Sequence, residues 1–171
     1  MSRTPPPIRA RSKAKWRSSA STKLSFFPMT VRIINKALIY ATWQGDLLVF
    51  DEPDFPDLLP QVPGGTIEAK ETQLDAAMRE FAEETGLTPP HEPAFLTRID
   101  HRAAHLKEQV IHRRHFFHVA LNGSFATEWL RTEHFPSTGE PPVLMRFFWI
   151  PVKEALLHLG YEHQAALPLI L

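Results

Sequence analysis

The chain has 171 residues, enough for a single domain with a complete hydrophobic core. Its 43% hydrophobic and 22% charged residues are ordinary for a globular protein, and it has no apolar run of about 18 residues that could span a membrane. The absence of cysteine excludes disulfides, zinc thiolate sites and a cysteine nucleophile. We therefore expect a cytoplasmic protein with no membrane partner.

The formal net charge of zero averages two unlike segments. Residues 1–28 contain seven Lys and Arg and no acidic residue, whereas residues 29–171 contain the other 12 against all 19 Asp and Glu, a net charge of −7. Binding to nucleic acid usually depends on basic side chains that neutralise phosphates. The acidic body therefore predicts no nucleic-acid partner, and it suits a protein that binds divalent cations.

The basic segment, residues 1–28, combines Pro5-Pro6-Pro7, scattered Lys and Arg, and a Ser-rich patch. It has little apolar content and no periodicity, which predicts a disordered leader. An organelle transit peptide, translation that starts at Met29, and a nucleic-acid-binding arm are the alternatives. We place the folded domain at residues 29–171.

Apolar stretches between turn signals predict a set of β-strands. They cover residues 31–41, 46–50, 94–100, 109–121 and 143–150. A long connection is expected over residues 122–142 and a final helix near residues 153–159. Strands mixed with two helices, without regular βαβ alternation, predict an α+β fold.

The clearest helix is predicted over residues 73–85. Thr72 is a suitable N-cap with Asp75 three residues later, and Gly86 stands where a helix commonly ends in the left-handed conformation. One apolar stripe at helical spacing is predicted to face the core: Leu74, Ala77, Met78 and Phe81.

A second face of this helix is acidic. At about 100° per residue, Glu80, Glu83 and Glu84 fall together, and no basic residue is expected between them. Like charges at this spacing repel by roughly a few tenths of a kcal/mol per pair, and carboxylate oxygens suit Mg²⁺, Mn²⁺ or Ca²⁺. An acidic helix face can also be merely solvated, so the face alone leaves both interpretations open.

The residues around the helix complete a longer pattern. Gly65, Glu71, Arg79-Glu80-Phe81, Glu83-Glu84 and Gly86-Leu87 fill the spacing G-x5-E-x7-R-E-U-x-E-E-x-G-U, where U is bulky and apolar. This pattern resembles the Nudix box, and Pro63-Gly64-Gly65 is also similar to that family. Weaker likeness covers most of residues 31–152, and residues 128–152 look like small bacterial Nudix proteins of unassigned substrate.

The resemblance implies a Nudix-type α/β/α sandwich with a mixed β-sheet, in which the box forms a loop, a helix and a second loop. It also implies that Glu80, Glu83 and Glu84 bind Mg²⁺, which Mn²⁺ can replace, with help from the backbone carbonyl of Gly64. Glu80 is then a candidate base. Arg79 and Glu71 are expected to form an ion pair that fixes the loop against the helix.

The implied activity is that of a Nudix pyrophosphohydrolase, which cleaves a pyrophosphate bond in a nucleoside diphosphate linked to another group. Mg²⁺ neutralises phosphate charge and lowers the pKa of a bound water, and a carboxylate takes the proton. Each residue also has a structural interpretation. Gly64 and Gly65 could serve a tight turn, and Arg79 could form a surface ion pair with Asp75 or Glu83.

Two further features suggest substrate contacts. Strand alternation over residues 109–121 puts His112, Arg114 and His118 on one face, where they could hold a substrate phosphate. A half-solvated strand with stacked histidines is the structural interpretation, and a zinc site is a weaker one. Trp129, in the long connection, is the candidate for stacking on a nucleobase, although large aromatic residues are commonly core.

A further catalytic or metal-binding glutamate outside the box is expected from the resemblance. Glu128, Glu133 and Glu140 are the candidates, and the sequence does not decide among them. It likewise leaves open whether the protein is a monomer or a homodimer, and which nucleotide derivative is the small-molecule substrate.

The alternative to the hydrolase is a Nudix-fold module that binds a nucleotide or ADP-ribose without cleaving it. The complete acid set favours the enzyme. An isomerase on the same scaffold, like the isopentenyl diphosphate isomerases, is disfavoured because those enzymes need a catalytic cysteine and this chain has none.

Overall fold

The computed structural model describes residues 31–104, 109–133 and 141–171. The basic segment 1–28 lies outside these residues, as do the domain boundary predicted at residue 29 and Glu140. In the described part of the chain the elements are, in order, β1 (Val31–Trp43), β2 (Asp46–Asp51), β3 (Gly64–Thr66), α1 (Gln73–Thr85), β4 (Ala94–Ala104), β5 (Gln109–Ala120), β6 (Glu128–Glu133), β7 (Val143–Pro151), α2 (Val152–His158) and the 3₁₀ helix η1 (Leu167–Leu169).

The strands form one mixed sheet. Its order is β4-β5-β1-β2-β7-β6, with β3 paired to β1 beside this path. β1 and β5 run parallel over residues 31–42 and 109–120, and the other pairs are antiparallel. The mixed sheet with two helices confirms the predicted α+β class.

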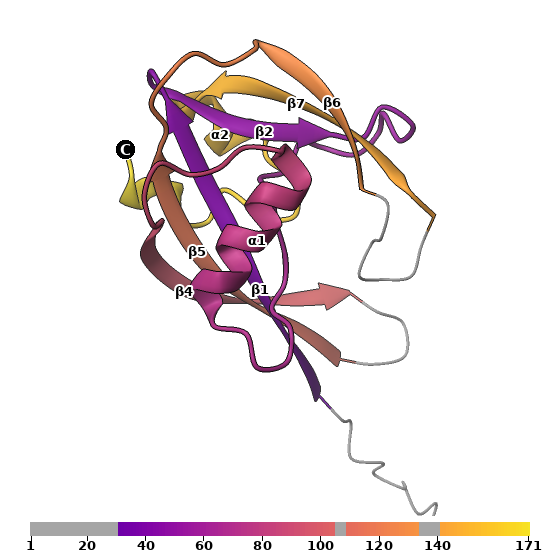
Figure 1. The fold of residues 1–171 in the computed structure, drawn as a ribbon. Coiled ribbons are helices and arrows are strands. Elements are labelled where there is room, and N and C mark those ends of the chain that lie inside the picture. Colours follow the sequence, from indigo (N-terminus) through magenta and orange to yellow (C-terminus); the bar gives the residue numbers. More distant parts are fainter. Residues whose placement is uncertain (1–30, 105–108, 134–140) are drawn as a thin grey trace, which may run out of the picture.

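The sheet is covered on both faces by apolar packing. Figure 1 shows α1 in front of the sheet and the C-terminal segment, in yellow, behind it. The core on the α1 side joins Ile39 and Phe117 of the sheet to Phe81 of the helix, and the core on the α2 side joins Tyr40 and Phe116 to the C-terminal segment. Neighbouring residues of β1 and β5 thus enter opposite cores, as strand alternation predicts.

Helix α1 begins and ends where the sequence predicts. The hydroxyl of Thr72 accepts the Asp75 amide at 3.1 Å and donates to the Asp75 carboxylate at 2.6 Å. Gly86 has a φ of 73°, and its amide donates to the Ala82 carbonyl at 3.0 Å. These contacts satisfy backbone groups that the helix itself leaves unpaired.

Two strands were not expected. β3 consists of Gly64, Gly65 and Thr66. Glycine has low strand propensity, and the strand forms because residues 36–38 of β1 offer an open edge. β6 lies within the predicted connection 122–142 and, in the described part of the chain, pairs with β7 alone, so Trp129 belongs to an edge strand and not to a loop.

The C-terminal segment is tied to the sheet by buried hydrogen bonds. The Tyr40 hydroxyl donates to the His163 carbonyl at 2.6 Å and accepts the Ala166 amide at 3.2 Å. Nδ1 of His163 accepts the Val62 amide at 3.4 Å, next to the glycines of β3. Burial, and then the positive charge of Arg114, lower the pKa of His163 to about 3, so its ring is neutral near neutral pH.

Helix α1 should depend on its central aromatic residue. Phe81 is fully buried in the core on the α1 side, so Phe81→Ala is expected to lower the free energy of unfolding by about 3–5 kcal/mol. Urea denaturation measures this loss. Leu157→Ala is the control, because Leu157 is largely exposed and its loss should cost less than about 0.5 kcal/mol. Equal effects of the two substitutions would contradict the packing described above.

His163 should make stability depend on pH. Its pKa is lower in the folded than in the unfolded protein, so the unfolded state takes up the proton first. Stability is then fully present above about pH 6.5 and falls, by up to about 1.4 kcal/mol per pH unit, as the pH drops towards the folded-state pKa. His163→Asn keeps an acceptor for Val62 and does not titrate. Urea denaturation at a series of pH values should give a free energy of unfolding that changes less with pH in the variant than in the parent. Parallel curves for the two proteins would refute the assignment of this pH dependence to His163.

Candidate active site

Arg79, in the middle of α1, forms a forked ion pair with the loop before the helix. Its Nε and Nη2 donate to the two carboxylate oxygens of Glu71 at 2.8 and 2.9 Å, and Nη2 donates to the Thr66 carbonyl at 3.1 Å. A bidentate pair of this kind fixes both groups in one orientation. The Arg79 guanidinium also holds the pKa of Glu71 below its usual range.

The same guanidinium reaches the acidic face of the helix. Nη1 of Arg79 lies 3.0 Å from a carboxylate oxygen of Glu80 and 3.2 Å from one of Glu83. The expectation that no basic residue contacts this face is therefore wrong for Glu80 and Glu83. Asp75, an alternative partner of Arg79 in the sequence, is hydrogen-bonded to Thr72 instead.

Glu84 is the most buried of the three helix carboxylates, with 7% of the residue exposed. Its Oε2 accepts the Gly64 amide at 2.9 Å. Burial raises the pKa of Glu84 well above its usual value, and the charges of Glu80 and Glu133 raise it further. Gly64 has a φ of 152°, and a Cβ there would overlap the Ala37 carbonyl, so this amide can approach Glu84 only from a glycine.

Glu80 lies against the second glycine of β3. A Cβ on Gly65 would overlap the carboxylate of Glu80, so the missing side chain leaves the space that this carboxylate occupies. Burial raises the pKa of Glu80, and the neighbouring Arg79 opposes part of the rise. Glu83 differs, because its side chain is largely exposed.

The donor set fits a hard divalent cation. Two carboxylates are held in partly desolvated positions where their charges repel, and a cation between them would relieve both costs. The described residues nevertheless contain no group of three or more His, Asp or Glu side chains already arranged around a metal position. The Glu83 side chain is largely exposed, and the Glu80 carboxylate is in contact with Arg79, so these carboxylates do not surround a common metal position.

Lys36 is a site residue that the sequence analysis missed. It lies on β1, in register with Thr66 of β3 and with Arg114 of β5. Burial lowers the pKa of Lys36, while the charges of Glu80 and Glu84 oppose the change, which places the ammonium in the field of the box glutamates. The sequence signal is weak, because Lys36 and Asn35 merely precede the apolar run of residues 37–41 within the predicted strand.

Among the candidate glutamates outside the box, Glu133 lies in the field of the site. It ends β6, and burial raises its pKa, with Lys36 opposing the shift and the charges of Glu52 and Glu83 adding to it. Glu128 begins the same strand and is exposed. The sequence could not separate the two because β6 itself was not predicted.

The structure does not bring His112 and Arg114 into hydrogen-bonding contact with the box. Arg114, only 5% exposed, lies on the α2 face, where Nη1 donates to the carbonyl of Tyr161. Burial lowers its pKa. The His112 ring faces that of His101 across β4 and β5, with 6.4 Å between centroids. Arg114 is in register with Lys36, whose ammonium lies in the field of Glu80 and Glu84.

Trp129 packs into the core on the α1 side. Its ring stacks on Phe147 at 5.4 Å with an angle of 16° between the planes, and its indole N–H donates to the Thr85 carbonyl at 3.0 Å. The indole groups of Trp43 and Trp149 likewise donate to backbone carbonyls. These contacts hold Trp129 against the end of α1.

Comparisons with known proteins agree with this geometry. The family model described as NUDIX domain matches residues 35–169. No curated protein sequence matches the chain. Among solved structures, a MutT NUDIX hydrolase from Burkholderia pseudomallei is similar, with a TM-score of 0.58 and 20% identity over 82% of this chain and 99% of the other.

Two other solved structures are similar to a comparable degree. One is a MutT protein from Bacillus halodurans, with a TM-score of 0.56 and 17% identity over 80% of this chain and 81% of the other. The second is the NUDIX domain of Shewanella oneidensis NrtR in complex with ADP-ribose, with a TM-score of 0.54 and 14% identity over 85% and 92%. These identities show the shared fold, and the family model covers most of the chain. The chain therefore belongs to the Nudix family.

Proposed function

We propose that this protein is a metal-dependent pyrophosphohydrolase that cleaves a nucleoside diphosphate linked to another group. The observation that carries the proposal is the complete acid set of the box, with Glu80 and Glu84 held in desolvated positions beside the glycines of β3. Carboxylates in such positions lower stability unless they serve a cation or a proton transfer.

Mg²⁺ is the proposed cofactor, and Mn²⁺ is expected to replace it. Glu80, Glu83 and Glu84, with the carbonyl of Gly64, are the residues that would hold the ion. When bound, the metal supplies neutralisation of pyrophosphate charge and a more acidic water. The raised pKa values of Glu80 and Glu84 agree with groups that also accept a proton.

Glu80 is the proposed base, with Glu133 as the alternative outside the box. A base must be able to hold the proton it takes, and the pKa of each of these two carboxyls is raised by burial. Arg79 is a positioning residue, because it holds Glu71 and the loop while contacting Glu80. Lys36 is the proposed contact for phosphate charge, since it lies in the field of Glu80 and Glu84.

A nucleotide-binding module without catalysis is the second candidate function. It is favoured by the similarity to the NrtR domain, whose structure contains ADP-ribose, and by the lack of a ready-made metal cluster in the described residues. The two functions differ in turnover. A cytoplasmic location and the absence of nucleic-acid partners stay predictions.

Loss of a single box carboxylate should remove turnover. We expect hydrolysis of one class from a panel of nucleoside triphosphates, nucleotide sugars, ADP-ribose, dinucleoside polyphosphates and coenzyme A, with either Mg²⁺ or Mn²⁺. Glu84→Gln should reduce it by about 10²-fold or more. The matched control is Glu128→Gln, an exposed glutamate on β6 that should leave the rate unchanged. Tight binding of a ligand with no turnover of any class would favour the binding module.

The same substitution should stabilise the metal-free protein. The pKa of Glu84 is higher in the folded than in the unfolded state, so stability falls as pH rises from the ordinary value of 4.5 through the folded-state pKa. At neutral pH Glu84→Gln removes this penalty and keeps an acceptor for the Gly64 amide.

Thermal unfolding in EDTA and in Mg²⁺ measures both effects. In EDTA the variant should unfold at a higher midpoint temperature than the parent. The difference between the two midpoints should narrow as the pH falls towards 4.5. Mg²⁺ should raise the midpoint of the parent more than that of the variant. A variant that is less stable at every pH, or equally stabilised by Mg²⁺, would argue against a metal role for Glu84.

A further inference from the structure

A hollow lies on the α1 face of the sheet, at the first turn of α1, and its walls include none of the glutamates of the last turns. It consists of two adjoining cavities of about 500 Å³ each, which share Glu71 and Gln73 in their walls. Their other walls come from β4, β5 and the loop before α1. The combined volume lies in the range of small-molecule sites.

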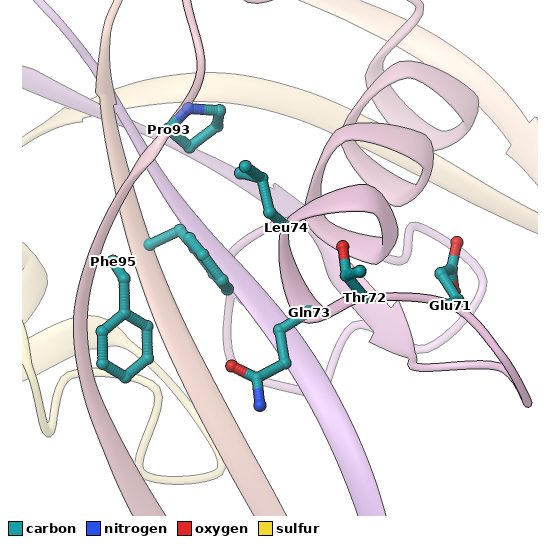
Figure 2. A pocket seen from close by; sticks show the side chains of 7 residues that line it. Glu71, Thr72, Gln73, Leu74, Pro93 and Phe95 are labelled. Atoms are coloured by element: carbon teal, nitrogen blue, oxygen red, sulfur yellow. The ribbon is translucent and has the colours of Figure 1, made fainter.

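One end of the hollow is apolar. Figure 2 shows Phe95 on one side of the pocket and Leu74 and Gln73 on the other, with Pro93 above them. Phe95 is 54% exposed, although it is a large aromatic residue in a strand, and Phe117 forms the buried floor beside it. This end can accept a flat aromatic ring against Phe95.

The other end is basic. Arg98, Arg113 and His115 line it together with Asn35. Arg113 is held by two 2.9 Å hydrogen bonds to Asp100, whereas Arg98 makes no ion pair with any described carboxylate. The charges of Arg98 and Arg113 both act on His115.

His115 gives this end an unexplained polar group. The residue is 4% exposed, lines the cavity, and its Nδ1 has no hydrogen-bonding partner among the described residues. Buried polar atoms in proteins are almost always paired, so an unpaired one at a cavity wall indicates a missing ligand or water.

The two ends are spaced for one small ligand. Phe117 and His115 are two residues apart on the same face of β5, about 7 Å along the strand. We propose that this hollow is a second ligand site, which binds a small organic anion carrying a flat aromatic ring, with the ring on Phe95 and the anionic group at Arg98 and His115. A nucleoside monophosphate has this chemistry. The proposal does not rest on the proposed hydrolysis, because the ligand contacts it names include none of the helix glutamates Glu80, Glu83 and Glu84.

The acidic residues of the hollow make the proposal specific. The Glu71 carboxylate is paired with Arg79. The exposed Glu68 also lines the basic end, and its side chain makes no ion pair with a described residue. It would repel a bound anion. Glu68→Gln should therefore tighten binding, a direction that general loss of structure would not produce.

Calorimetric titration in excess EDTA tests the site with AMP, adenosine and inorganic phosphate as probes. AMP should bind, and Arg98→Ala should weaken AMP and phosphate about fivefold or more. Phe95→Ala should weaken AMP and adenosine but not phosphate. Glu84→Gln, in the catalytic region, should leave all three unchanged, and circular dichroism should show each variant folded.

NMR titration of the histidine rings locates the ligand. The His115 signals should shift on addition of AMP, because an anion beside the ring changes its electrostatic environment. Absence of AMP binding at millimolar concentration would overturn the proposal. Binding lost in Glu84→Gln but retained in both Arg98→Ala and Phe95→Ala would overturn it as well, since the ligand would then sit in the catalytic region.

Discussion

The arrangement of the site depends on the guanidinium of Arg79. One planar group binds both oxygens of Glu71, the carbonyl of Thr66, and one oxygen each of Glu80 and Glu83. The loop and the helix are therefore fixed by a single side chain with five donors in a rigid plane. A lysine could not reproduce this, because its ammonium lacks the fork that holds Glu71 at two points.

Glu84 is a contrasting case. Its carboxyl group is buried where the surrounding protein offsets the cost of a negative charge only in part. Its Oε2 accepts a hydrogen bond from the Gly64 amide, but burial raises its pKa and the charges of Glu80 and Glu133 raise it further. A protein optimised for stability alone would replace such a group with an apolar or amide side chain. A bound cation, as proposed above, or a transferred proton would offset that cost.

Local signals predicted the part of the site that lies on α1. The helix, its Thr72 cap and its Gly86 end follow from residues within a few positions of each other, and so does the acidic face. β3 and Lys36 could not be predicted, because the strand exists only through pairing with β1 and the lysine enters the site only when β3 lies beside it. The surroundings of Arg114 could not be predicted for a related reason. Alternation gave its face correctly, but the cover on that face is the C-terminal segment, whose Tyr161 carbonyl accepts its donor.

Helix α1 separates two environments along its length. Its last turns carry carboxylates whose pKa values are raised, whereas its first turn adjoins Arg98 and His115, where the local charge favours an anion. Glu71 lies between these two environments. It lines the hollow, and it forms an ion pair with Arg79, which in turn contacts Glu80. Any ligand that displaced the Glu71 carboxylate would free a guanidinium beside Glu80 and so change the field at the proposed base. The ion pair that fixes the loop before α1 is thus also a physical link through which the two proposed sites could influence each other.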